Sequence, residues 1–199
     1  MNRKDPEVSR MPFELKSARF LAREVLERAV LPGDTVVDAT MGNGHDTLFL
    51  AEQVGPEGRV YAFDIQESAL ASTRKLLAEN GLSSRVTLLY ASHADLEEIV
   101  PGPVSAVVFN LGWLPGGDHQ VTTLCASTEK AVRAALRLLR PGGVMTVCAY
   151  PGHDEGTREL EMLVTLFASL SNREFNVLRQ SFLNAGEGAP ECFVVQKLK

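Results

Sequence analysis

Hydrophobic positions along the chain alternate between helical spacing and short β-branched runs. The first helical pattern covers residues 13–30, where apolar residues recur every three or four positions, and it ends at Leu31-Pro32-Gly33. Five runs typical of strands follow, at 35–39, 59–63, 86–90, 104–109 and 144–150. Helical patterns lie between them, at 46–53, 67–80, 95–99 and 122–139.

This alternation predicts the fold class. Strands separated by helices need right-handed crossovers, which give a parallel sheet with helices on both faces. A further helix at 155–169 and strands at 175–183 and 192–198 follow, and their short connection suits an antiparallel hairpin. We therefore predict an α/β, Rossmann-like fold with a doubly wound, seven-stranded, mainly parallel sheet and an antiparallel C-terminal hairpin. Its ligands should bind beyond the carboxyl ends of the strands.

Length and composition limit the function classes. A chain of 199 residues with 45% hydrophobic content supports one domain, predicted at 13–199, after a charged leader at 1–12 that we expect to be flexible. The net charge of −5 excludes nucleic-acid binding through bulk charge, so RNA would need a local basic patch. The first residues form no signal peptide, no apolar run reaches about 18 residues, and the three cysteines are far apart, which predicts a cytoplasmic protein without membrane contact.

A glycine-containing turn follows the first predicted strand. Gly42 and Gly44 lie between the strand at 35–39 and the helix at 46–53, where glycine allows a positive φ and a close approach of the backbone to a ligand. The second strand ends at Asp64, whose carboxylate could accept hydrogen bonds from both hydroxyls of an adenosine ribose. Together these features predict a site for a nucleoside cofactor.

The residues around this turn favour S-adenosylmethionine over NAD. Thr47 occupies the third glycine position of the dinucleotide pattern, and Asp38 would repel a pyrophosphate. A cofactor that carries an ammonium and a sulfonium group would instead be attracted by Asp38 and Asp64. The structural alternatives are a tight turn without a ligand, and a helix-capping role for Asp46.

The loop after the fourth strand carries the residues that we expect to bind the molecule that accepts the methyl group. Asn110 offers a carboxamide oxygen that could hold an amine with its lone pair directed at an electrophilic methyl carbon, and Trp113 could stack on a base. Alternatively, Asn110 caps the loop and Trp113 covers the edge of the core. Asp118, His119 or water could help to keep an amine neutral, so Asn110, Asp118 and His119 are the candidate catalytic residues.

All four histidines follow predicted strands, which would gather them on one rim of the sheet. They are His45, His93, His119 and His153. Their spacing provides no rigid set of ligands, so we expect no metal and predict hydrogen bonds to cofactor and substrate instead.

Three segments together resemble a known family. Residues 38–47, residues 110–118 and the Gly-His-x-x-Gly segment at 152–156 are similar to the small bacterial "putative rRNA methylase" family of class I methyltransferases, and the resemblance runs from about Leu15 to the C-terminus. It implies a tRNA methyltransferase that converts the 5-aminomethyl group of wobble 5-aminomethyl-2-thiouridine to the 5-methylaminomethyl form. The anticodon stem-loop would be its partner. Trp113 stands where Tyr is more usual, and residues 184–190 are glycine-rich where the family is proline-rich.

The motifs and the resemblance together give a set of site residues. The expected cofactor contacts are Asp38, Thr40, Gly42, Asn43, Gly44, Asp46, Thr47, Asp64, Gln66, Ser92 and His93. By the resemblance, Trp113 and His153 would bind the acceptor, beside Asn110 and His119.

Basic helix faces provide the candidate RNA contacts. They are Arg19, Arg23 and Arg28 on the first helix, and Lys130, Arg133, Arg137 and Arg140 on the helix after the fourth strand. The alternative is that both are solvated helix faces. Competing functions are methylation of rRNA or of a small amine, NAD-dependent oxidation, and noncatalytic RNA binding. A homodimer is expected if a second subunit helps to hold RNA.

Overall fold

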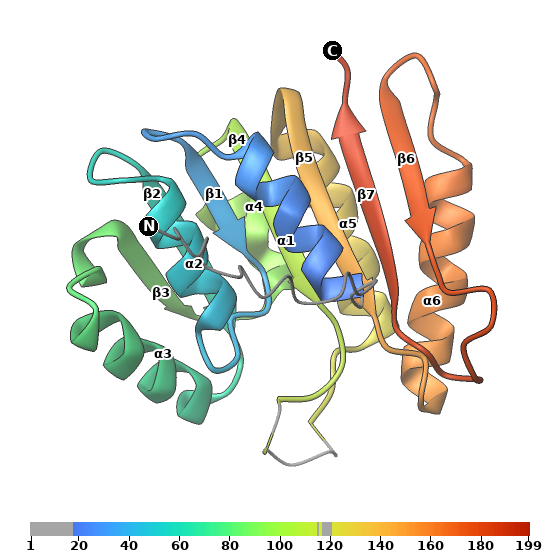
Figure 1. Cartoon of the computed structure of the whole chain (residues 1–199), viewed down its shortest axis with the longest axis horizontal. Helices are drawn as coiled ribbons and strands as arrows, with labels where there is room; N and C mark the ends of the chain where they lie inside the picture. Colours follow the sequence, from blue (N-terminus) through green and yellow to red (C-terminus); the bar gives the residue numbers. More distant parts are fainter. Residues whose placement is uncertain (1–17, 115, 117–120) are drawn as a thin grey trace, which may run out of the picture.

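The protein is built on one seven-stranded sheet. The computed structural model describes residues 18–114, 116 and 121–199. The strand order is β3-β2-β1-β4-β5-β7-β6, in which β1 to β5 are parallel and β7 runs antiparallel to both β5 and β6 (Figure 1). The strands are β1 (Thr35–Asp38), β2 (Arg59–Asp64), β3 (Val86–Tyr90), β4 (Val104–Asn110), β5 (Leu139–Ala149), β6 (Phe175–Gln180) and β7 (Glu191–Lys197).

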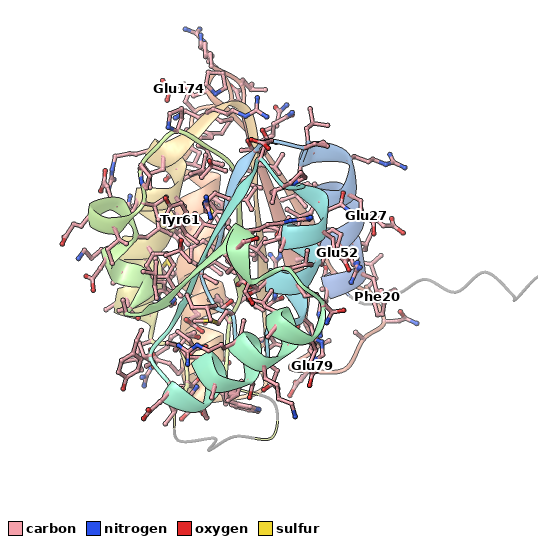
Figure 2. The ribbon with its side chains drawn as sticks, turned by 90° about the vertical axis from the view of Figure 1, so that its left-hand side faces the viewer. Phe20, Glu27, Glu52, Tyr61, Glu79 and Glu174 are labelled. Carbon is pink, nitrogen blue, oxygen red and sulfur yellow. The ribbon has the colours of Figure 1, made fainter. Side chains whose placement is uncertain are left out.

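Helices cover both faces of the sheet. One face carries α1 (Ala18–Ala29), α2 (His45–Gln53) and α3 (Glu67–Glu79), and the other carries α4 (Leu96–Ile99), α5 (Cys125–Leu138) and α6 (Asp154–Ala168). Two 3-10 turns, η1 (Ser83–Arg85) and η2 (His93–Asp95), flank β3. Figure 2 looks at the sheet from its β3 side, with Glu27 and Glu52 on the α1 and α2 side and Tyr61 on the opposite side.

The central strands are buried on both faces. Along β4, Ala106 and Val108 pack into the core under α1 and α2, whereas Val107 and Phe109 pack into the core under α5 and α6. Alternate residues of a strand point to opposite faces, so a slip by one residue would exchange the two sets. The register is therefore fixed, and the carboxyl ends of the parallel strands meet at one edge.

The predicted fold class, the order of its elements and the antiparallel hairpin are confirmed, but three element boundaries were wrong. The helix expected from residue 122 begins at Cys125, because Thr122 bridges to Trp113 and the Thr123 N–H donates to the carbonyl of Gly112. The fifth strand starts at Leu139, which pairs with Val104 before a register irregularity. The sixth strand ends at Gln180, since its last pairing with β7 is Gln180 with Cys192.

Some predictions fall outside the described residues. These are the leader at 1–12 and the first turn expected for the helix at 13–30. The single domain at 13–199 therefore stays a prediction. Within the part of the chain that the structure describes, no helix combines the length and the apolar character that crossing a membrane requires.

We predict that Gly58→Ala destabilises the fold. Gly58 lies just before β2, where an added Cβ would collide with Cβ and O of Val54 and would lie 2.8 Å from the carbonyl oxygen of Asp34. Two of these atoms belong to the backbone and cannot move away, so the free energy of unfolding should fall by about 1–3 kcal/mol. Urea unfolding followed by circular dichroism measures the change.

The control for this prediction is Gly186→Ala. A Cβ at Gly186 would meet no atom within 4 Å. Equal stabilities of the two variants would contradict the prediction.

Candidate functional site

The predicted site residues lie at the carboxyl edge of the parallel strands. Asp38, Asp64 and Asn110 are the last residues of β1, β2 and β4. Ser92 and His93 follow β3, and His153 follows β5 at the start of α6. The candidate catalytic residues Asp118 and His119 lie outside the described residues.

The glycine turn is held between β2 and α3. The N–H of Gly42 donates to Oδ2 of Asp64 at 3.0 Å, and the Thr73 hydroxyl donates to the carbonyl of Gly42 at 3.0 Å. Gly44 has a φ of 85°, and a Cβ there would lie 2.7 Å from Oγ1 and 3.0 Å from Cα of Thr73. Glycine is therefore required at this position both by its backbone conformation and by the close approach of α3.

Asp64 presents a carboxylate that still has acceptor capacity. Its Oδ1 accepts from the N–H of Gln66 at 2.9 Å, and its Oδ2 accepts from Gly42. The two oxygens of a carboxylate can accept about four hydrogen bonds, so Asp64 keeps acceptor capacity for a ligand hydroxyl. Burial raises the pKa of Asp64 above its usual range, and the N–H donors of Gln66, Gly42 and Ile65 act in the opposite direction.

Asp38 lies beneath the turn instead of on its surface. It is fully buried, and it accepts hydrogen bonds from the Thr47 hydroxyl at 2.6 Å and from the N–H of Thr40 at 3.2 Å. Burial and, to a smaller extent, the charge of Asp46 raise the pKa of Asp38 to about 7. Thr47 is also fully buried. In this arrangement Asp38 and Thr47 support the turn.

Asn110 is held by two neighbouring segments. Its N–H donates to Oγ1 of Thr40 at 2.7 Å, and its Nδ2 donates to Oδ2 of Asp46 at 2.7 Å. Only Nδ2 can donate to a carboxylate, which fixes the orientation of the amide. The remaining oxygen, Oδ1, is buried and has no hydrogen-bond partner in the described part of the chain. The site therefore contains an oriented acceptor atom that a ligand N–H can satisfy.

Asp46 orients this amide and does not cap its helix. The N-cap residue of α2 is Gly44, and the described structure gives it no side-chain capping bond. Asp46 lies in the first turn of α2, where its Oδ2 is 3.7 Å from Nε of Arg19 as well as bonded to Asn110. The capping alternative for Asp46 is thus not observed.

Trp113 and His153 form a stacked pair on the acceptor side. Their ring centroids lie 4.6 Å apart at an angle of 41°, and Trp113 keeps 37% of its surface exposed. Nδ1 of His153 accepts from the N–H of Gly156 at 3.2 Å, so in the neutral ring the proton is on Nε2. That Nε2 is buried without a partner among the described residues. The Nε2–H group can donate a hydrogen bond to an oxygen or sulfur atom of a substrate.

Gly156 makes the position of the His153 ring possible. A Cβ at Gly156 would collide with the carbonyl oxygen of Tyr150 and would lie 2.9 Å from Nε2 of His153. This gives a physical reason for the spacing of the Gly-His-x-x-Gly segment. Beside it, the connection between β6 and β7 approaches closely, because a Cβ at Gly188 would be 3.0 Å from Cα of Gly152.

The described histidines share the predicted edge but have different surroundings. His93 is buried, its Nδ1 lies 3.3 Å from the carbonyl oxygen of Ala39, and its ring packs edge-on against Phe109. Burial lowers the pKa of His93, which favours the neutral ring. His45 is exposed at the start of α2. Among the described residues, no group of three potential ligands could hold a metal ion.

Two supporting residues were not predicted. Thr73 holds the glycine turn, and Glu159 on α6 accepts from the hydroxyls of Thr123 and Thr128 behind the loop that follows β4. Each is a buried polar residue on the apolar face of its helix. That mismatch with the helical pattern is the signal by which they could have been found.

Comparisons with known proteins agree with this geometry. The profile of a family described as "Putative rRNA methylase" matches residues 60–196. A protein of Arabidopsis thaliana, "tRNA (mnm(5)s(2)U34)-methyltransferase, chloroplastic", is 39% identical over 183 residues, which make up 86% of this chain and 66% of that protein. The chain thus spans slightly less than two thirds of that relative's length.

Solved structures give closer matches in length. The "putative rRNA-methylase" of Clostridium thermocellum is 40% identical with a TM-score of 0.91, and the match covers 94% of this chain and all of that one. The "putative methyltransferase" SMU.1697c of Streptococcus mutans, solved in complex with SAH, is 32% identical with a TM-score of 0.85, covering 93% of this chain and all of that one. The chain therefore belongs to the "Putative rRNA methylase" family, within the S-adenosylmethionine-dependent methyltransferases.

Proposed function

We propose that the protein transfers the methyl group of S-adenosylmethionine to the 5-aminomethyl group of a wobble 5-aminomethyl-2-thiouridine in tRNA, giving the 5-methylaminomethyl form. The observation that carries this proposal is the Asn110 amide, which Asp46 orients so that a buried Oδ1 has no partner in the described chain. The printed name of the Arabidopsis thaliana relative, a tRNA (mnm(5)s(2)U34)-methyltransferase, supports the choice of acceptor.

The cofactor side fits a cationic nucleoside. The remaining acceptor capacity of Asp64 suits a ribose hydroxyl, and the Gly42 to Gly44 turn leaves backbone open to close approach. Three carboxylates surround the turn, Asp38, Asp46 and Asp64, and they favour a ligand with positive charge. Asn43, Gln66, Ser92 and His93 stay predicted contacts of this cofactor.

The acceptor side fits a primary amine. When bound, S-adenosylmethionine supplies an electrophilic methyl group on a sulfonium. Asn110 Oδ1 would accept one N–H of the neutral amine, which turns the nitrogen lone pair toward that methyl carbon. The product ammonium then loses a proton to water or to a nearby base, for which Asp118 and His119 stay candidates.

The stacked pair would hold the base that carries the amine. Trp113 offers an exposed ring face for stacking, and His153 offers its Nε2–H. With Nδ1 engaged by Gly156 and the proton on Nε2, the neutral His153 is a hydrogen-bond donor and not the proton acceptor of the reaction.

The predicted basic helix faces offer little free charge for RNA. Of the four cations expected on the helix after β4, Lys130, Arg133 and Arg137 lie on α5, whereas Arg140 lies in β5. Each of the four lies within 4 Å of a carboxylate: Lys130 of Asp95 and Glu98, Arg133 of Glu129, Arg137 of Glu97 and Arg140 of Asp34. On α1, Arg19 pairs with Asp46 and Arg23 with Glu27. These pairs favour solvated helix faces, so base stacking carries more of the proposed recognition than charge does. A homodimer that holds the anticodon stem-loop, and a cytoplasmic location, stay predictions.

Nucleoside mass spectrometry tests the proposed reaction. We expect tRNA from cells lacking the activity to gain one methyl group at the wobble uridine when incubated with protein and S-adenosylmethionine. Asn110→Ala should lower the rate by about 100-fold or more, because the amine loses its orienting acceptor. Binding of S-adenosylhomocysteine by calorimetry should stay unchanged in this variant. A methyl group found only in rRNA or in a small amine would reassign the acceptor.

A second prediction concerns Asp64. Asp64→Ala should weaken cofactor binding by about 10- to 100-fold, since it removes charge-assisted hydrogen bonds to the ribose and releases the N–H of Gly42. Calorimetric titration measures the affinity. The matched control is Glu67→Ala, an exposed carboxylate three residues further along; if both variants bind alike, Asp64 has no such role.

The pH dependence of cofactor affinity tests Asp38. The pKa of Asp38 is about 7 in the free protein, and a nearby cation favours the ionised carboxylate. Binding below pH 7 must therefore release a proton, so affinity should rise with pH up to about 7, by at most about tenfold per pH unit, and then level off. Asp38→Asn should flatten this rise. An unchanged pH profile in the variant would exclude Asp38 as its source.

A further inference from the structure

The two ends of the loop after β4 are clamped together. Gly112 and Thr123 exchange two hydrogen bonds: the N–H of Gly112 donates to Oγ1 of Thr123 at 2.9 Å, and the N–H of Thr123 donates to the carbonyl of Gly112 at 3.0 Å. Next to them, Trp113 and Thr122 form an antiparallel bridge. The position of Trp113 therefore depends on where Thr123 is held.

Thr123 is held by a buried carboxylate. Glu159 is only 1% exposed, and its Oε2 accepts from the Thr123 hydroxyl at 2.8 Å. Its Oε1 accepts from the hydroxyl of Thr128, which is fully buried. An ionised carboxylate only accepts hydrogen bonds, so both hydroxyl protons must point to Glu159. The Thr123 oxygen then has its lone pairs directed away from Glu159, where the N–H of Gly112 meets one of them.

The same helix carries the partner of Trp113. His153 is the N-cap residue of α6, and Glu159 lies in the second turn of that helix. In addition, Oε1 of Glu155 accepts from the N–H of Cys125 at the start of α5. Thus α6 contacts one ring of the stacked pair directly and the other through Thr123 and Gly112.

We propose that Glu159 and Thr123 are positioning residues that fix the Gly112–Trp113 turn and so set the place of Trp113 against His153. The consequence for methyl transfer rests on the proposed function, in which this pair holds the acceptor base. The effect on Trp113 itself does not depend on that function. A buried acid in the core of α6 is costly to keep, because burial raises the pKa of Glu159 against the two hydroxyl donors. In this proposal, Glu159 is retained at a buried position because it holds Thr123 in place.

Thr123→Val and Thr128→Val form a matched pair for the test. Each removes one hydroxyl donor from Glu159, but only Thr123→Val also removes the acceptor of the Gly112 N–H; the backbone hydrogen bond from Thr123 to Gly112 remains. Trp113 is the only tryptophan in the chain, so its fluorescence reports the turn without any substrate. We expect Thr123→Val to shift the emission to longer wavelength and to raise quenching by acrylamide. Thr128→Val and Thr123→Ser should keep the emission of the original protein.

Kinetics provide the second readout. Thr123→Val should lower kcat/KM for tRNA by about tenfold or more while the affinity for S-adenosylhomocysteine stays unchanged. Thr123→Ser should restore the rate. If Thr123→Val does not fold, Glu159→Met replaces it, since methionine keeps about the volume of the side chain but removes the carboxylate acceptor of both hydroxyls; the same emission shift is expected.

The outcomes separate this proposal from the proposed function. If Thr123→Val, or Glu159→Met where that variant replaces it, has the same Trp113 fluorescence as Thr128→Val, the positioning role is overturned. A lack of tRNA methylation by the original protein would overturn the proposed function and leave the fluorescence result to decide the role of Glu159.

Discussion

Burial of the central strands on both faces is the constraint on which the site depends. Along β4, neighbouring residues pack into two separate cores, so a slip by one residue would exchange side chains that fit different surroundings. The height of β4 relative to β1 and β2 is therefore set along its whole length. Asp38, Asp64 and Asn110 end three neighbouring strands in this fixed register, so none of them needs a long side chain or a flexible loop to reach the others.

The polar groups at this edge of the sheet are held in place by hydrogen bonds to other polar groups beneath or beside them. Asp38 and Thr73 lie under or behind the glycine turn, and Asp46 lies beside Asn110. At this edge, Asn110 Oδ1 is buried and has no partner in the described chain. Buried polar atoms normally find partners, so an orphaned acceptor held by a carboxylate indicates a site that is completed by binding.

Much of this could be predicted from the sequence, because the informative residues follow strands. The periodicity gave the order of the elements, and Gly42, Gly44 and Asp64 gave the cofactor edge. The pattern could not give the direction of the side chains. Asp38 points under the turn and Asp46 orients Asn110 because of contacts between distant segments. Glu159 was missed for the same reason, since its partners lie more than thirty positions earlier in the chain. The start of α5 was misplaced because Thr122 and Thr123 fit a helix locally but pair with the loop.

The contact between Gly152 and Gly188 has a consequence for how this site can vary. Where the C-terminal connection meets the loop after β5, two main chains touch with no side chain between them. Because this contact is made by backbone atoms alone, it depends on the shape of the two segments and not on the side chains of the residues around it. The connection at 184–190 can thus exchange most of its side chains among relatives without a change in the loop after β5, provided that Gly188 stays glycine.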